Sequence, residues 1–177
     1  MQRTSFAAMD CPIARALEAL GEWWSLLILR DAFLGVTRFD DFQASLGIAP
    51  NMLTRRLKRL VDARLLERHP YSQRPLRHDY RLTAAGRDAF PVLAALGAWG
   101  TGHATGGKVL VQLVGRADSR RLDPVLIDRR SGMPITPETA EFRLGPDAGA
   151  EGRGRAARIL ARRAETAADT VANIVSA

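Results

Sequence analysis

Residues 39–63 read FDDFQASLGIAPNMLTRRLKRLVDA, and this stretch specifies the central part of the fold. Its first apolar residues recur at helical spacing, which predicts a short helix over residues 39–46 that Gly47 ends. After a three-residue turn, Pro50 predicts the start of a second helix that runs to about Ala63. Two helices joined by a tight turn that contains glycine are typical of a helix-turn-helix.

Two helices are predicted before this stretch. The first covers about residues 12–20 and carries an apolar stripe that we expect to be buried, formed by Ile13, Ala16, Leu17 and Leu20. The second covers residues 22–34 and is apolar nearly all round, with two tryptophans near its start. A helix without a polar face is typical of the middle of a domain.

A hairpin and a longer helix are predicted after this stretch. Two short β-rich segments, residues 66–71 and 77–82, bracket a five-residue loop and indicate a β-hairpin. Thr83 is a suitable cap for a further helix that reaches about His103. We expect Pro91 to kink this helix, because proline has no backbone N–H to donate.

Beyond Gly106 the pattern changes to short apolar segments and loops. Three short strands are predicted, at residues 109–114, 125–128 and 142–144, and a terminal helix from Arg153 to about Ile174. Apolar residues of that helix follow a weak heptad spacing: Ala157, Leu160, Ala164, Ala167, Val171 and Ile174. We therefore divide the chain into two parts, residues 1–104, which contain the predicted helix-turn-helix and hairpin, and an extension, residues 105–177.

Positive charge is concentrated between Arg55 and Arg81. Nine basic residues lie in this segment against three acidic ones, a local excess of six in a chain whose net charge is +7. The basic residues are Arg55, Arg56, Lys58, Arg59, Arg64, Arg68, Arg74, Arg77 and Arg81. A cationic patch on a helix and the hairpin after it is the electrostatic signature of a surface that meets phosphate backbones. The general preference for arginine over lysine can equally reflect genome composition.

The helix that begins at Pro50 has two different faces. At 100° per residue, Leu53, Leu57, Leu60 and Val61 gather on one side and must face the core. The opposite side carries the candidate DNA-binding residues Asn51, Thr54, Arg55, Lys58 and Arg59. We expect the first three, at the amino end, to contact bases and the last two to contact phosphates. An ordinary solvated charged face is the alternative interpretation.

The hairpin loop supplies a second candidate contact with DNA. Arg74 and Pro75 lie at its tip and Arg77 follows closely, so guanidinium groups stand on a stiffened loop that can reach a minor groove. A surface hairpin with unrelated arginines is the simpler alternative.

A set of short motifs extends across residues 9–104. They are Cys11-Pro12, Trp24-Ser25-Leu26-Leu27-Ile28-Leu29-Arg30, Arg38-Phe39, Met52-Leu53-Thr54-Arg55-Arg56-Leu57, Tyr71 with Pro75, Tyr80-Arg81-Leu82-Thr83 ahead of Gly86, and Pro91-Val92-Leu93 ahead of Trp99-Gly100. In combination they resemble the HxlR-type winged-helix transcription regulators, which are related to the MarR group. The resemblance implies a homodimeric bacterial repressor or activator that dimerises through the first and last helices of its core.

Cys11 is the only cysteine and lies at a predicted helix start, where partial positive charge favours the thiolate, with Arg15 one turn on. The resemblance implies that this position can sense oxidants, whereas a lone cysteine is more often a small buried hydrophobe. Oxidation would have to produce an intersubunit disulfide or a mixed disulfide with a small thiol. A single cysteine also fits a reducing compartment, so we expect a cytoplasmic protein.

No enzymatic site is predicted. The three histidines lack metal-ligand spacing, and the glycines near residue 100 do not form a phosphate loop, so we expect neither metal nor cofactor. Only residues 105–150 could hold a catalytic site, and they supply no acid, base and nucleophile at useful spacing. No apolar run is long enough for a membrane span.

The sequence thus predicts a mainly α fold with a small β-hairpin wing, a winged helix-turn-helix core followed by a small α+β C-terminal extension. We expect a homodimer that binds double-stranded DNA at a palindromic operator, as a repressor or an activator, with a small-molecule or oxidant effector. The alternative is a winged-helix protein-interaction module without sequence-specific DNA binding.

Overall fold

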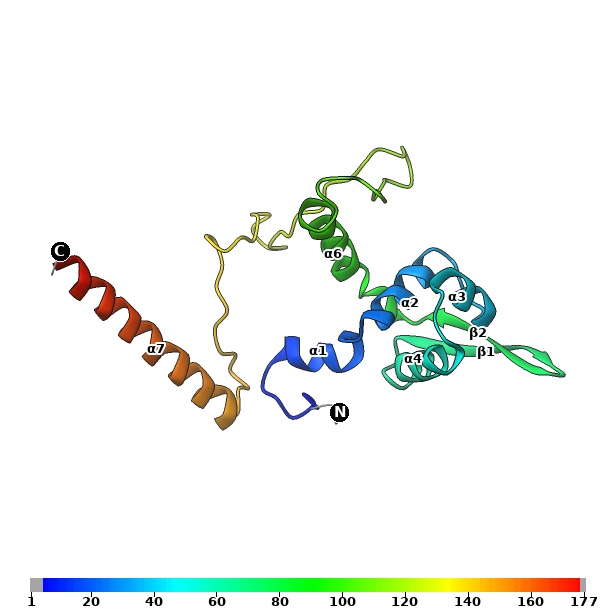
Figure 1. Ribbon diagram of the computed structural model, residues 1–177, viewed down its shortest axis with the longest axis horizontal. Coiled ribbons are helices and arrows are strands. Elements are labelled where there is room, and N and C mark those ends of the chain that lie inside the picture. The colour runs from blue at the N-terminus through cyan, green and yellow to red at the C-terminus, as the bar shows by residue number, and fades with distance from the viewer. Residues whose placement is uncertain (1–4, 176–177) are drawn as a thin grey trace. The chain divides into compact units, whose positions relative to one another are not determined.

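The computed structural model describes residues 5–175, and side chains as far as residue 162 (Figure 1). It consists of two compact units, residues 19–139 and residues 1–18 together with 140–177. The elements are α1 (Pro12–Leu20), α2 (Trp23–Phe33), α3 (Phe39–Leu46), α4 (Pro50–Asp62), β1 (Leu66–Gln73), β2 (Leu76–Leu82), α5 (Ala84–Arg87), α6 (Phe90–His103) and α7 (Ala150–Val175). Within the described range, none of these helices combines the length and the apolar character that a membrane span requires.

The helix-turn-helix forms as predicted. α3 ends at Gly47, which adopts the left-handed conformation with φ of 62° and donates its N–H to the carbonyl of Gln43 at 2.9 Å. Glycine suits this position because it has no Cβ to clash there. Pro50 then opens α4. The winged helix-turn-helix fold predicted from the sequence is confirmed by these helices and the hairpin that follows them.

The core of the larger unit lies where α2, α3, α4 and β1 meet. Its buried hydrophobic residues are Ile28, Leu29, Phe42, Ile48, Leu53, Leu57, Leu60 and Leu66. The leucines of α4 predicted to face the core do so, while Val61 is half-buried at its edge. The expectation that α2 is buried all round is wrong at its start, because Trp23 precedes the core contacts and is 77% exposed.

The wing is a two-stranded antiparallel hairpin of β1 and β2. Its strands are longer than predicted, because Ser72 pairs with Arg77 and Gln73 with Leu76, which reduces the loop to Arg74 and Pro75. Tyr71 has no partner in the register, so it forms a β-bulge in β1. Such a bulge bends the strand that carries it.

The prediction of a single kinked helix after the wing is wrong, because two separate helices form there. Thr83 caps α5 as expected, since its Oγ1 accepts the N–H of Gly86 at 3.0 Å. The break falls at Asp88 and Ala89, so Pro91 lies in the first turn of α6, where its missing N–H costs nothing. None of the residues of α6 is buried.

The three short strands predicted between residues 109 and 144 are not formed. In their place are two tight turns, each closed by an isolated bridge: Val114 with Arg121, and Ile127 with Pro134. The large apolar side chains of residues 109–114 and 125–127 are mostly exposed. Two-stranded pairs without a covering layer are only marginally stable, which explains why the ladders do not extend.

In the other unit, the predicted terminal helix is confirmed as α7. Asp10 joins the first turn of α7 to the N-terminal segment: its Oδ2 accepts the N–H of Gly152 at 3.3 Å, and its carbonyl accepts from Arg155 at 2.7 Å. Of the predicted heptad seam, Ala157 and Leu160 are exposed and the other side chains lie outside the described residues.

The prediction that the apolar stripe of α1 is buried is also largely wrong. Ile13, Ala16 and Leu17 are exposed, whereas Leu20 is half-buried against the core, and Ala14 is the buried residue of this helix. Burial of a helix stripe needs a second surface packed against it, which the apolar spacing by itself does not provide.

Candidate DNA-binding surface

The outward side of α4 carries most of the candidate residues. Asn51, Thr54, Arg55 and Lys58 are exposed, and Arg59 is half-buried. The opposite side is held by the fully buried Leu53, Leu57 and Leu60. Packing of these leucines fixes the rotation of α4, so its cationic side must face away from the core.

The arginines and the lysine of α4 differ in their partners. Nη2 of Arg55 lies 3.6 Å from the sulfur of Met52, a neutral group. Lys58 pairs with Asp62 at 2.6 Å, an exposed i, i+4 pair of little stabilising value. Among the side chains described, residues 5–162, Arg55 has no carboxylate within salt-bridge distance. The positive charge of Arg55 is therefore available to interact with a phosphate or a base.

Thr54 and Arg56 serve the structure of α4 itself. The hydroxyl of Thr54 donates to the carbonyl of Pro50 at 2.9 Å. The guanidinium of Arg56 pairs with Glu22 at 2.7 Å, and its side chain is largely buried. Arg56 therefore contributes to the attachment of α4 and not to its outward face.

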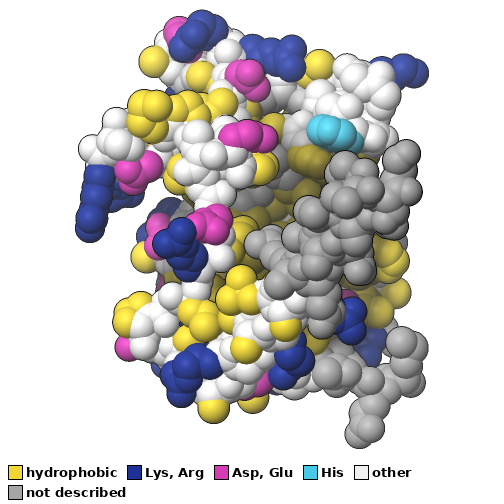
Figure 2. Space-filling model, turned by 90° about the vertical axis from the view of Figure 1, so that its left-hand side faces the viewer, with side chains coloured by type: hydrophobic (Ala, Val, Ile, Leu, Met, Phe, Trp, Pro, Cys, Tyr) yellow, Lys and Arg dark blue, Asp and Glu magenta, His cyan; other side chains and the backbone are white. Residues whose placement is uncertain are grey.

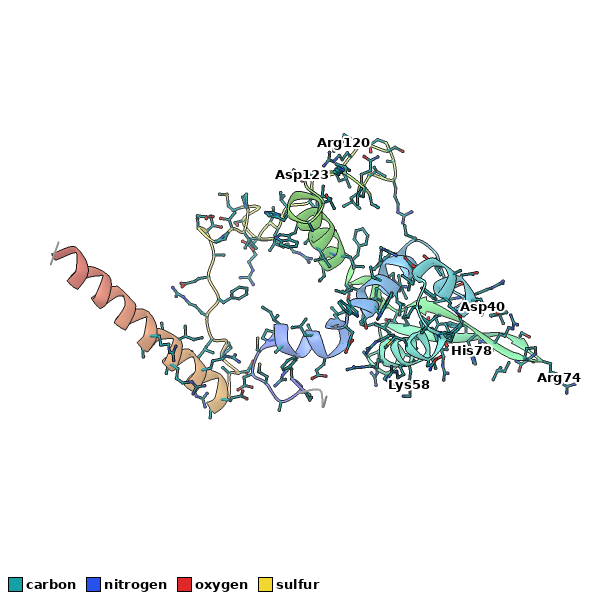
Figure 3. The ribbon with its side chains drawn as sticks, viewed as in Figure 1. Asp40, Lys58, Arg74, His78, Arg120 and Asp123 are labelled. Atoms are coloured by element: carbon teal, nitrogen blue, oxygen red, sulfur yellow. The ribbon has the colours of Figure 1, made fainter. Side chains whose placement is uncertain are left out.

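The two candidate residues of the wing have different environments. Arg74 is exposed at the far end of the hairpin, well away from Asp40 and His78, which lie closer to the helices (Figure 3). Nη1 of Arg77 lies 3.6 Å from Oδ2 of Asp40 in α3. The pKa of Arg77 is raised, chiefly by its hydrogen bond with the side chain of Tyr71 and then by the charges of Tyr71 and Asp40. Arg77 is thus charged and already partnered within the protein.

Sequence reasoning missed Arg38 and Asp40 as residues that bear on this surface. The guanidinium carbon of Arg38 lies 4.7 Å from the centroid of the Tyr71 ring, and its Nε lies 3.8 Å from Oδ1 of Asp79. Their positions just before and within α3 carry no periodic signal. Only their contacts with the wing reveal them.

Cys11 is half-buried immediately before α1. Its N–H donates to the carbonyl of Met9 at 2.8 Å, and its own carbonyl accepts from the N–H of Arg15 at 3.0 Å. The guanidinium of Arg15 turns to Asp10, at 3.6 Å, and to the carbonyl of Met9, at 2.9 Å. The basic side chain that we expected near the thiol is therefore engaged by a carboxylate and a carbonyl.

Comparison with known proteins gives matches over the helix-turn-helix and beyond it. A model of the HxlR-like helix-turn-helix family matches residues 19–107. An uncharacterized HTH-type transcriptional regulator of Mycobacterium tuberculosis is 42% identical over 135 residues, which are 76% of this chain and 85% of that protein.

Two solved structures are similar to this fold. PA1374, a candidate transcription factor from Pseudomonas aeruginosa, is 53% identical with a TM-score of 0.61, over 82% of this chain and 99% of that one. The redox regulator HypR in its reduced form is 27% identical with a TM-score of 0.51, over 54% of this chain and 96% of that one. The first of these similarities extends well past α6 into the extension.

Proposed function

The chain belongs to the HxlR family of helix-turn-helix transcriptional regulators, and on this basis we propose that it is a cytoplasmic repressor that binds a palindromic operator as a homodimer. Each protomer inserts the amino end of α4 into a major groove. Two-fold symmetry then requires half-sites whose centres are about 34 Å apart, or a multiple of that spacing. Binding at such a site blocks access of the polymerase.

The observation that carries this proposal is the outward face of α4. Asn51 and Arg55 are exposed side chains near the amino end of a helix whose other face is locked into the core. Arginine can pair with both acceptors of guanine, and asparagine with the donor and acceptor of adenine. Lys58 and Arg59, one turn further on, suit phosphates.

Selection of bound DNA from a random pool, at a low and a high salt concentration, tests this proposal. We expect enrichment of an inverted repeat, with binding that weakens steeply as salt increases. Failure to enrich any sequence, together with binding that is weak and insensitive to salt, would instead favour a protein-interaction module.

The wing tip is expected to contribute affinity without sequence preference. Arg74→Ala should weaken binding to every sequence and make the salt slope shallower by about one, because the exposed guanidinium at the tip meets only the backbone or a minor groove. Titrations of two unrelated duplexes at several salt concentrations measure both effects. Gln73→Ala, an uncharged change at the adjacent position, is the matched control and should leave the slope unaltered.

The apolar surface of α6 supports dimerisation. Val92, Leu96 and Trp99 are exposed at positions i, i+4 and i+7, so they form one apolar stripe on a helix that has no buried residue. Hydrophobic side chains are also visible at the surface of the single chain in the space-filling view (Figure 2). Exposed apolar stripes of this kind mark surfaces that bind another protein. The exposed Ile13 and Leu17 give α1 a similar face of its own.

Placing a charge in the α6 stripe should separate the protomers. Leu96→Glu is expected to convert a dimer to a monomer at micromolar concentration, because a carboxylate buried at the interface would lack a partner. Light scattering measures the mass, and operator binding should weaken in parallel. Ala98→Glu places the same charge on an exposed part of α6 away from the stripe and should stay dimeric. A wild-type protein that is monomeric would contradict the homodimer.

We further propose that Cys11 makes DNA binding responsive to oxidants. Its partial exposure just before α1 supports access by small reagents, and the similarity to the redox regulator HypR supports this class of signal. An oxidant converts the thiol to a sulfenic acid, and a second thiol then displaces water to form a disulfide. That second thiol is Cys11 of the other protomer or a small thiol such as glutathione.

Treatment with hydrogen peroxide and glutathione should change the operator affinity of the wild type by about tenfold, a typical coupling between two sites. Cys11→Ser, which preserves size and polarity, should bind equally with and without oxidant. Mass spectrometry of the same samples identifies the disulfide formed. If wild type and variant respond alike to the oxidant, Cys11 is not the sensor.

A further inference from the structure

The base of the wing is joined to the segment before α3 by backbone contacts. Residues Arg38 and Asp79 form an antiparallel bridge, and the N–H of Tyr80 donates to the carbonyl of Thr37 at 2.7 Å. These bonds do not depend on the side chain at position 38. They hold the root of the hairpin in place. The outer half of the hairpin, which runs from His78 to the tip at Arg74, is not held by these backbone bonds.

Side chains extend the support to the outer half of β1. Tyr71 is the bulged residue, three positions before the tip residue Arg74. The guanidinium of Arg38 lies over the Tyr71 ring at 4.7 Å from its centroid, a geometry for a cation–π contact. The side chain of Arg38 also reaches Asp79 at the root. One side chain therefore links the root of the wing to the position where β1 bends.

A second contact ties the outer half of β2 to α3. Arg77 pairs with Asp40 at 3.6 Å, and the side chain of Tyr71 raises the pKa of Arg77. Two side-chain contacts, Arg38 with Tyr71 and Arg77 with Asp40, thus lie on the outer half of the wing, just before its tip. All four residues are exposed, so these contacts bear on the orientation of the hairpin and not on the packing of the hydrophobic core.

We propose that Arg38 and Tyr71 are positioning residues that set the direction of the wing tip and so place Arg74 against DNA. An isolated two-stranded ribbon is marginally stable, and a bulge lets it bend in more than one direction. Stacking of Arg38 on the bulged residue selects one direction before DNA arrives. This inference rests on the proposed function, because it concerns how the same surface binds DNA.

A double-mutant cycle tests the inference on the full-length protein and the selected operator. Arg74→Ala should weaken binding by about fivefold or more in the wild type, but by less than about twofold when Arg38→Ala is also present. When the wing tip no longer points at the groove, Arg74 contributes little to the affinity, so its removal has little further effect. Hydroxyl-radical footprints should show weaker protection in the flanking minor groove and retained protection around the major groove.

Arg81 provides a matched control for Arg38. Both side chains are 57% exposed and both pair with Asp79, but Arg81, at 3.2 Å from its Oδ2, is not the residue that stacks on Tyr71. Arg74→Ala should therefore keep its full effect in the Arg81→Ala background. Tyr71→Phe retains the ring and should preserve the coupling between positions 38 and 74, whereas Tyr71→Ala should abolish it. Thermal unfolding of each variant confirms that it is folded.

The outcomes separate this inference from the proposed function. If the wild type and Arg55→Ala bind DNA equally weakly, both are overturned. If Arg55→Ala weakens binding but the effects of Arg38→Ala and Arg74→Ala multiply independently, only the positioning role is overturned. The same holds if Arg74→Ala has no effect in the wild type.

Discussion

Arg55→Ala is expected to weaken binding to the selected operator by about 1–3 kcal/mol, on the order of five- to a hundredfold in affinity. Arg55 is exposed on the outward face of α4, and its nearest polar contact is the neutral sulfur of Met52. No internal ion pair among the described residues must break before it binds DNA, so its removal eliminates the whole interaction. The preference for one base of each half-site should also disappear.

Lys58→Ala is the matched control for this prediction. Lys58 lies on the same face, one turn later, and pairs with Asp62. Its loss should lower affinity for all sequences alike, because a lysine on a phosphate carries no base information. Competition titrations with operators that differ at each position distinguish the two patterns. Equal operator affinity of the wild type and Arg55→Ala would contradict the proposed role of α4 in sequence recognition.

Phe42→Ala is expected to destabilise the protein by about 3–5 kcal/mol. Its ring is fully buried between α2, α3 and α4, and its loss leaves a cavity that these helices cannot close without shifting. Because α3 packs beside α4, on which the proposed DNA contacts depend, the variant should also bind operator more weakly near its unfolding transition. Urea denaturation at one fixed protomer concentration measures the change, since association of protomers alters apparent stability.

Phe142→Ala removes the same ring from a position that is 95% exposed. The free energy of unfolding should then change by no more than about 0.5 kcal/mol. If the two variants are equally stable, Phe42 does not belong to the core. If Phe142→Ala is strongly destabilising, the extension is covered by a surface that the single chain lacks.

The helix-turn-helix could be predicted because its signals are local. The bounds of α3 follow from apolar spacing and from Gly47, whose positive φ suits glycine, and the start of α4 follows from Pro50. The outward face of α4 follows from the same periodicity, once its leucines are assigned to the core. These features need only residues within a few turns of one another.

The extension and the first helix were less predictable. Apolar segments at residues 109–114 and 125–127 carry a strand-like composition, but a strand also needs a partner and a covering layer. The apolar stripe of α1 similarly indicates burial without indicating against what. Both patterns indicate a preference for apolar surroundings that the described side chains, those of residues 5–162, do not provide.

The helix-turn-helix, the wing and the cationic outer face of α4 are properties of the amino-acid order alone, because periodicity and turn chemistry act between near neighbours. Which basic side chains are available to contact DNA depends instead on how the chain packs. Packing pairs Arg77 with Asp40 and Arg56 with Glu22, and it sets Arg38 against Tyr71, while Arg55 and Arg74 remain exposed. Such pairings join residues distant in the chain, and their geometry exists only after the helices and the hairpin have come together.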